Sequence, residues 1–225
     1  VQASANAMDK HTTKQIWQQA GLPMPLHRLG HAQTDWMQVV AEIGDRLIVK
    51  PSREGSTIGI TKVTSHDRNE LALAFEAAVR YDDTVLIEQL VTGRELTCAI
   101  LGEGATAEAL PLIEIRAPDA NYDYHSKYFS DETKYLCPAP LDPALAARIA
   151  ALSVQAYRAL GARGWGRVDV MLRDDGAPFL LELNTSPGMT GHSLVPMAAK
   201  AVGLSYEDLV LRILGMATLD HRRAA

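Results

Sequence analysis

The sequence predicts an α+β fold in which antiparallel strands pack against helices. Residues on both sides of the turn sequence DDGAP (174–178) alternate between apolar and polar, which is typical of a hairpin, and several longer runs carry apolar residues at helical spacing. One strand-like run ends and another begins near Thr92 and Gly93. We therefore expect a smaller unit at residues 1–91, with a lead-in segment, and a larger unit at residues 92–225.

The smaller unit is expected to alternate helices and strands. In its first helix Ile16 and Trp17 would face inward, and Gly21 would end the helix. A loop follows this helix. The expected elements are helices at 9–20, 34–44 and 68–82, strands at 46–52 and 84–91, and a glycine-bearing turn at 54–63 that feeds a return strand.

The larger unit is expected to surround a strand pair with helices. Residues 117–143 are polar, aromatic and turn-rich, and a segment of this length is usually functional or disordered. The expected elements are strands at 92–102, 164–172 and 178–184, helices at 143–162, 194–201 and 206–217, and a frayed tail at 220–225.

The composition excludes several classes of function. The chain of 225 residues has 22 Lys plus Arg against 27 Asp plus Glu, and a net charge of −5 argues against a broad basic surface for nucleic acid or anionic lipid. No apolar run approaches the roughly 18 residues that span a membrane. Cys98 and Cys137 lack a histidine at metal-ligand spacing, which fits free thiols. We expect a cytoplasmic protein without nucleic-acid or membrane partners.

Four polar residues interrupt the strand pair on either side of DDGAP: Arg167, Asp169, Glu182 and Asn184. If Asp175 and Gly176 form a two-residue turn, Asp169 lies opposite Glu182 and Arg167 lies opposite Asn184. All four then share one face because strand side chains alternate. The other face, directed at the core, would hold Val168, Val170, Leu181 and Leu183.

This arrangement predicts a divalent metal site. Opposed carboxylates whose Cα atoms lie about 5.5 Å apart repel each other unless a cation lies between them. The oxygen donors of Asp169, Glu182 and Asn184 suit Mg²⁺ or Mn²⁺, whose open positions would take phosphate oxygens and water. The alternative is an exposed sheet face with an Asp–Arg cross-strand pair. A slip of one residue in register would remove the constellation.

Other residues could hold a nucleotide, although neither a P-loop nor a Rossmann glycine motif occurs. Lys50 ends a strand just before a loop whose backbone amides could cover phosphates. Glu88 and Glu95 flank the proposed unit boundary, and Lys127 lies in the long 117–143 segment. In the loop NTSPGMTGHS, amides and the Ser193 hydroxyl could receive a carboxylate. Each signal is weak when taken alone.

Taken together, the motifs MDK, VKPSREGSTIGITKV, LIEQLVTGRE, YDYHSKYFSDET, GWGRVDVML and LLELNTSPGMTGHSLVPMAA resemble those of the D-alanine:D-alanine ligases of the ATP-grasp superfamily. The resemblance runs from about Met8 to Ala217. It implies two α+β lobes, at 1–91 and 92–225, that grip ATP between antiparallel sheets. It also implies ligation of two D-alanines through an acyl phosphate, for peptidoglycan precursor synthesis, in a cytoplasmic homodimer.

The resemblance also implies roles for individual residues. For ATP, Lys10, Lys50 and Lys127 would contact phosphates, Glu88, Gln89, Leu90 and Val91 would border the adenine, and Glu95 would bind the ribose. Asp169, Glu182 and Asn184 would hold two Mg²⁺ ions. For the reaction, Arg167 would stabilise transition-state charge, Ser56 and Tyr128 would orient substrates, and Gly188 and Ser193 would bind the second D-alanine carboxylate.

Three alternatives stay open at this stage. One is another ATP-grasp carboxylate:amine ligase, and a second is a D-alanine:D-lactate ligase. Tyr128 argues against the latter, because related D-lactate enzymes carry Phe there. The third is an inactive ATP-binding fragment. Family members carry an amino-terminal domain before MDK that supplies a Glu to the first D-alanine, so we expect nucleotide binding to tolerate its loss better than ligation does.

Overall fold

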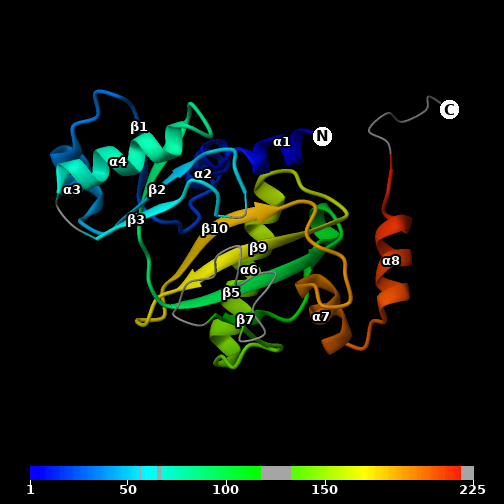
Figure 1. Ribbon diagram of the computed structural model, residues 1–225. Coiled ribbons are helices and arrows are strands. Elements are labelled where there is room, and N and C mark those ends of the chain that lie inside the picture. Colours follow the sequence, from blue (N-terminus) through cyan, green and yellow to red (C-terminus); the bar gives the residue numbers. More distant parts are fainter. Residues whose placement is uncertain (56, 65–66, 118–132, 219–225) are drawn as a thin grey trace.

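The computed structural model describes residues 1–55, 57–64, 67–117 and 133–218, and here the chain forms two antiparallel sheets with helices around them (Figure 1). In chain order the elements are α1 (Gln2–Met8), α2 (Lys10–Gln19), β1 (His27–Gly30), α3 (Trp36–Ile43), β2 (Leu47–Pro51), β3 (Thr61–Val63), α4 (Arg68–Val79), β4 (Val85–Gln89), β5 (Arg94–Leu101), the 3₁₀ turn η1 (Gly104–Thr106), β6 (Glu108–Ala109), β7 (Ile113–Arg116), β8 (Lys134–Leu136), α6 (Pro143–Ala159), β9 (Trp165–Leu172), β10 (Pro178–Asn184), α7 (Leu194–Ala201) and α8 (Tyr206–Gly215). Within these residues no helix is long and apolar enough to cross a membrane.

The smaller sheet has the strand order β1-β4-β2-β3. Alternate residues of its central strands, including Val49 and Ile87, are buried in a core with α3 and α4. The opposite face of the same strands carries Lys50 and Glu88, which are also buried. This sheet therefore has an apolar face toward its own helices and an opposite face on which two buried charges lie among apolar residues.

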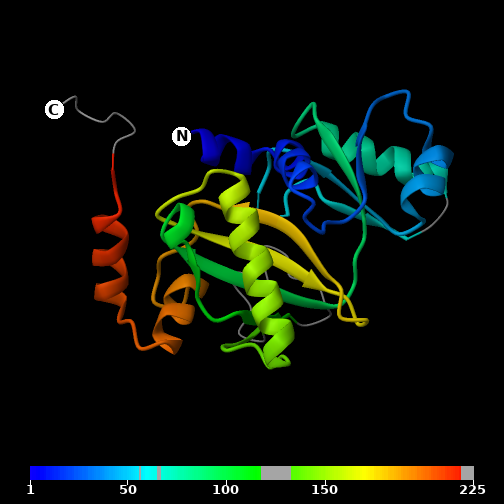
Figure 2. The same cartoon turned by 180° about the vertical axis from the view of Figure 1, so that it is seen from behind.

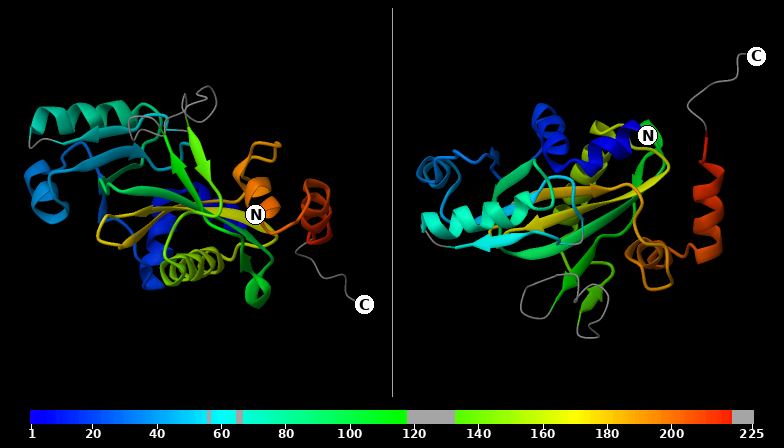
Figure 3. Two further views of the ribbon diagram at one scale, coloured as in Figure 1. Left: turned by 90° about the horizontal axis from the view of Figure 1, so that it is seen from below. Right: turned by 45° about the horizontal axis from the view of Figure 1, so that its top comes forward.

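The larger sheet has the strand order β10-β9-β5-β7-β8, with β6 paired to β5. Figure 2 shows α6 crossing one face of it, where Ile149 and Tyr157 are fully buried against the strands. Helix α6 begins where Asp142 accepts hydrogen bonds from the amides of Ala144 and Leu145. The two views of Figure 3 show α8 at the edge of the molecule, beyond α7.

The first 22 residues pack with the larger sheet, although the sequence assigns them to the smaller unit. The side chain of Trp17 is fully buried and its Nε1 donates to the carbonyl of Ala156 on α6 at 3.0 Å. Ala7 and Leu22 belong to the same core. The linker between the sheets is short, since β4 ends at Gln89 and β5 begins at Arg94. A unit boundary after residue 91 stays a prediction.

Several short elements lie where the sequence shows no periodic signal. Helix α1 forms within the expected lead-in, β1 within an expected loop, and β8 within the long 117–143 segment. Strands β1 and β8 are three or four residues long and lie at sheet edges, where they pair with β4 and β7. Such strands are defined by their hydrogen-bonded partner rather than by local sequence.

The β9–β10 hairpin has the predicted register at its polar end. Asp169 lies opposite Glu182, and Arg167 lies opposite Asn184. The predicted two-residue turn is wrong: the Arg173 amide bonds the Ala177 carbonyl, the Gly176 amide bonds the Arg173 carbonyl, and Gly176 has φ +83°. These features define a three-residue loop ending in a left-handed glycine.

A β-bulge restores the predicted pairing. Next to the turn the register is offset by one residue, so that Leu180 lies opposite Val170, and the register shifts back between Leu180 and Glu182. Consequently Leu180, not Leu181 as predicted, is buried in the core. The bulge changes which leucine faces inward while leaving Glu182 opposite Asp169.

Candidate active-site cleft

A cleft of about 810 Å³ lies over the polar end of the β9–β10 hairpin. It is bounded by the end of α1, the start of α2, the 54–55 segment and the loop that follows β10. The residues expected to act on ATP or substrate that line it are Lys10, Arg167, Glu182, Asn184, Gly188 and Ser193. Met8, Tyr135 and His192 also line it, and the sequence did not single them out for this site.

Arg167 and Asp169 form a paired unit beneath the cleft. Arg167 Nε and Nη2 each donate to one oxygen of Asp169 at 2.8 Å. Thr97 of β5 lies opposite Asp169 in the sheet, is 1% exposed and donates its hydroxyl to Asp169 Oδ1 at 2.7 Å. Thr97 was missed in the sequence because its strand had to be placed beside β9 before it could be related to Asp169.

Lys10 reaches the same face from the start of α2. Its Nζ lies 3.7 Å from Glu182 Oε2 and donates to the Glu54 carbonyl at 2.5 Å. Burial lowers the pKa of Lys10, as does the neighbouring Lys50, while Glu182 opposes the shift. Asn184 Oδ1 accepts the Ser186 amide at 3.1 Å. Lysine and carboxylate from distant segments therefore meet at one edge of the cleft.

The donor atoms at this end fit a hard divalent cation. Asp169, Glu182 and Asn184 supply only oxygen, the chemistry that Mg²⁺ prefers, and Glu182 keeps 38% of its side chain exposed. Within the described ranges, no group of three or more His, Cys, Asp or Glu side chains could hold a metal ion. The candidate site has only two carboxylates, so the side-chain oxygen of Asn184 is needed as its third protein ligand.

A buried ion cluster joins α2 to the smaller sheet. Glu88 Oε1 lies 2.5 Å from Lys14 Nζ, and Glu88 Oε2 pairs with Lys50 Nζ. Burial alone would raise the pKa of Glu88, but the two ammonium groups outweigh it and lower the pKa to about 2. Lys14 was missed in the sequence. The available signal was its position four residues after Lys10, which places two lysines on one helix face.

The other residues expected near the nucleotide lie along the strand ends that join the sheets. Gln89 ends β4, and its amide donates to the Leu26 carbonyl, while the Leu90 amide donates to the Arg46 carbonyl at 2.7 Å. Val91 is half-buried in the linker. Glu95 of β5 lies opposite Met171 of β9, on the face that carries Thr97 and Asp169. Ser56, Lys127 and Tyr128 lie outside the described residues.

The loop after β10 is held by hydrogen bonds within it and from α8. Ser193 Oγ accepts the Thr190 amide at 2.9 Å, and the Tyr206 hydroxyl of α8 donates to the Met189 carbonyl at 2.6 Å. A Cβ at Gly188 would come within 2.9 Å of Ser193 Oγ, so glycine permits the close approach of these two residues. Gly188 and Ser193, expected to bind one carboxylate, thus lie together at the cleft.

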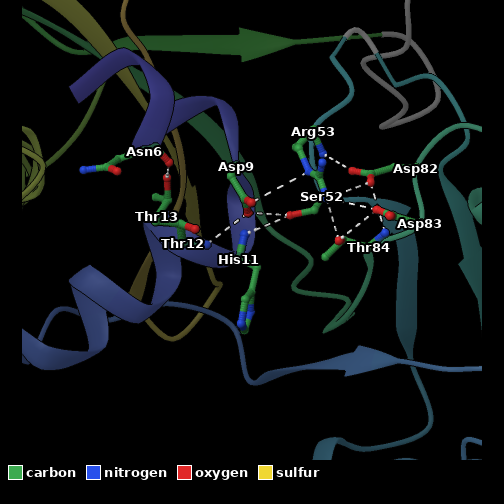
Figure 4. Close-up of polar contacts among 10 residues, drawn as sticks. All are labelled: Asn6, Asp9, His11, Thr12, Thr13, Ser52, Arg53, Asp82, Asp83 and Thr84. Carbon is green, nitrogen blue, oxygen red and sulfur yellow. Dashed lines mark hydrogen bonds and ion pairs between the residues drawn. The ribbon is translucent and has the colours of Figure 1, made fainter. Parts of the chain in front are cut away.

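A polar network fixes the start of α2 to the end of β2 (Figure 4). The Ser52 hydroxyl donates to Asp9 Oδ1 at 2.8 Å and accepts the His11 amide at 3.1 Å, while the Ser52 carbonyl accepts the Lys10 amide. Arg53 extends the network to Asp83, 3.0 Å away. Lys10 is thereby held between Asp9 and His11, which both bond Ser52. Lys50 lies two positions before Ser52 in the chain.

Replacing Ser52 with alanine should destabilise the protein by about 1–3 kcal/mol, because the fully buried Ser52 satisfies the His11 amide and the Asp9 carboxylate. Urea unfolding measures this loss. The matched control is Ser205→Ala, which removes an exposed hydroxyl cap from α8 and should cost about 1 kcal/mol or less. Equal losses in the two variants would mean that the network adds nothing beyond ordinary capping.

The family model described as "D-ala D-ala ligase C-terminus" matches residues 16–215. Proteins named D-alanine–D-alanine ligase from Cupriavidus taiwanensis and Ralstonia nicotianae are each 61% identical to this chain, over 98% and 99% of its length respectively. The chain spans 67% of the length of both relatives.

Two solved structures are also similar. The VanG D-Ala:D-Ser ligase from Enterococcus faecalis superposes with a TM-score of 0.84 at 32% identity, over 96% of this chain and 63% of its own. The D-alanine-D-alanine ligase from Coxiella burnetii superposes with a TM-score of 0.80 at 25% identity, over 96% of this chain and 59% of its own. Each of these structures therefore extends well beyond the matched part.

Proposed function

The chain belongs to the D-alanine–D-alanine ligase family, and from that premise we propose that it is the ATP-binding and catalytic part of an enzyme that joins two D-alanines. Its α+β fold is the ATP-grasp fold expected from the sequence motifs. The proposed reaction yields D-alanyl-D-alanine, ADP and phosphate for peptidoglycan synthesis. The proposed setting is the cytoplasm, where the enzyme acts as a homodimer.

One observation carries this proposal. Arg167, Glu182 and Asn184 project from two paired strands into a single cleft, and Lys10 reaches it from another segment. Guanidinium, carboxylate, amide and ammonium groups together suit a substrate that brings phosphate and a divalent cation. An exposed sheet face with a structural Asp–Arg pair would not require Lys10, whose side chain is only 12% exposed, to lie 3.7 Å from Glu182 on the same face.

The first step would transfer the γ-phosphoryl group of ATP to the carboxylate of one D-alanine, because a free carboxylate is a poor acylating agent. Lys10 and Lys50 are proposed to contact the phosphates, together with Lys127. Asp169, Glu182 and Asn184 would hold two Mg²⁺ ions, which when bound neutralise charge on the phosphate oxygens. Glu88 through Val91 would border the adenine, and Glu95 would bind the ribose.

The second step would be attack of the second D-alanine's amine on the acyl phosphate. Arg167 would stabilise the developing oxyanion, since its guanidinium lines the cleft and its orientation is fixed by Asp169. Ser193 and the Gly188 amide would bind the carboxylate of the incoming D-alanine. Ser56 and Tyr128 are proposed to orient the substrates.

The test is mass spectrometry of products formed from Mg²⁺-ATP and D-alanine, with D-lactate or D-serine as competing second substrates. The assay uses two forms of the protein: the chain alone, and the chain joined to the amino-terminal domain that the resemblance implies for members of this family. We expect D-alanyl-D-alanine and ADP from the joined protein. The Asp169→Asn variant should stay folded by circular dichroism and lose Mg²⁺-dependent phosphoryl transfer.

Other outcomes of the same assay separate the alternatives. A depsipeptide or D-alanyl-D-serine as the main product would reject D-alanine as the second substrate. ATP binding without any product from the joined protein would favour a nucleotide-binding module that is not an enzyme. Loss of folding in Asp169→Asn would support a structural role for the Asp169–Arg167 pair instead of a metal site.

A further inference from the structure

Lys14 is a buried charge that the proposed reaction does not use. Its side chain is 0% exposed, and its ammonium lies 2.5 Å from Glu88, whose side chain is 2% exposed. A buried lysine is costly unless it is paired, and an apolar side chain on α2 would pack at that position without this cost. The position of Lys14 therefore calls for an explanation beyond the stability of α2.

The neighbouring charges explain why a lysine is buried at this position. Glu88 also pairs with Lys50, whose side chain keeps 11% of its surface exposed, and Lys10 at the edge of the cleft is electrostatically coupled to both. Without Lys14, Glu88 would cancel the charge of Lys50. With Lys14 present, the cluster of Lys14, Glu88 and Lys50 retains one net positive charge.

We propose that Lys14 is a positioning residue that neutralises and orients Glu88, so that the ammonium of Lys50 remains available to the phosphates of the nucleotide. The inference rests on the proposed ATP site and extends it to a residue that does not touch the ligand. Glu88 holds the Lys50 side chain in place, and Lys14 compensates the charge of Glu88. The acid thereby fixes a phosphate-binding lysine without weakening the attraction of the site for anions.

The test compares the binding of ATP and adenosine to the purified chain by calorimetry. Lys14→Met should weaken ATP binding roughly tenfold to a hundredfold, the effect of one unit charge several ångströms away at intermediate dielectric. Adenosine binding should change by less than about threefold, because adenosine carries no phosphate charge. A structural defect in α2 would instead weaken the binding of ATP and of adenosine by the same factor.

The double variant Lys14→Met/Glu88→Gln removes both charges and leaves Lys50 as the net positive group. The ratio of its ATP affinity to its adenosine affinity should return to within about threefold of the wild-type ratio, because any effect of Glu88→Gln on the adenine changes both affinities alike. The matched control is Lys200→Met, which removes an exposed lysine at the end of α7 and should leave both affinities unchanged.

The outcomes distinguish this inference from the proposed function. A wild-type chain that binds no ATP would reject the nucleotide site itself. If the wild type binds ATP, three results would overturn the role of Lys14: unchanged ATP affinity in Lys14→Met, an equal loss of ATP and adenosine binding in that variant, or a double variant whose ratio of ATP to adenosine affinity stays as low as in Lys14→Met.

Discussion

Replacing Arg167 with methionine is expected to lower kcat for dipeptide formation by about 10²–10³-fold, the usual cost of removing one donor that stabilises an oxyanion. Arg167 is the guanidinium that lines the cleft, and only 17% of its side chain is exposed. Asp169 holds it through two hydrogen bonds, so little reorganisation is needed during the reaction. Steady-state kinetics of the joined protein at saturating ATP measures the effect.

The hairpin itself offers a control for this prediction. Arg173 makes the same two-point contact with Asp175, two residues along the same chain, but at the exposed turn. Arg173→Met should leave kcat unchanged. Arg167→Lys keeps the charge but loses the planar fork, so it should fall between methionine and wild type. If kcat falls by less than fivefold in Arg167→Met, Arg167 does not stabilise the oxyanion of the reaction.

Glu88→Gln is expected to cost about 3–5 kcal/mol of unfolding free energy, which would leave little of a typical domain's stability. The change leaves Lys14, which is 0% exposed, without its counter-charge. Urea unfolding measures the loss. The control is Glu114→Gln: Glu114 is also buried, but its partners Arg94 and Arg116 are 35% and 55% exposed and can be hydrated, so the cost should be much smaller.

Glu88 also predicts how stability depends on pH. Its pKa is about 2 in the folded protein against an ordinary value of 4.5, because Lys14 and Lys50 outweigh the effect of burial. The unfolded state therefore binds the proton more tightly. The contribution of Glu88, roughly 3 kcal/mol, should be fully present above pH 4.5 and lost as the pH falls toward 2. If Glu88→Gln and the wild type lose stability equally over this range, Glu88 is not the group responsible.

The pairing of the polar residues on the β9–β10 hairpin was predictable because its register depends on a strong local signal. Alternation of polar and apolar residues around DDGAP places Asp169 opposite Glu182, and the structure has that pair. The turn was wrongly predicted, yet the bulge between Leu180 and Glu182 compensates for the difference of one residue. A bulge forms through cross-strand packing, so no pattern within β10 alone indicates it.

The long-range contacts of the site were not predictable in the same way. Thr97 reaches Asp169, 72 residues away, only because β5 lies beside β9 in the sheet. Ser52 binds Asp9 across 43 residues, and Lys14 finds Glu88 on another element. Each partner is an ordinary polar residue in its own segment, and its role appears only when two segments meet.

The sequence alone determined the fold class, the main helices and the polar face of the β9–β10 hairpin, because these depend on periodicity and on contacts between near neighbours. Tertiary structure decided that α2 packs on the larger sheet through Trp17 while its Lys14 pairs with Glu88 of the smaller one. It also decided which lysine is buried and which reaches the cleft. Burial and charge compensation arise between segments distant in the chain, so they exist only once the two sheets have come together around α2.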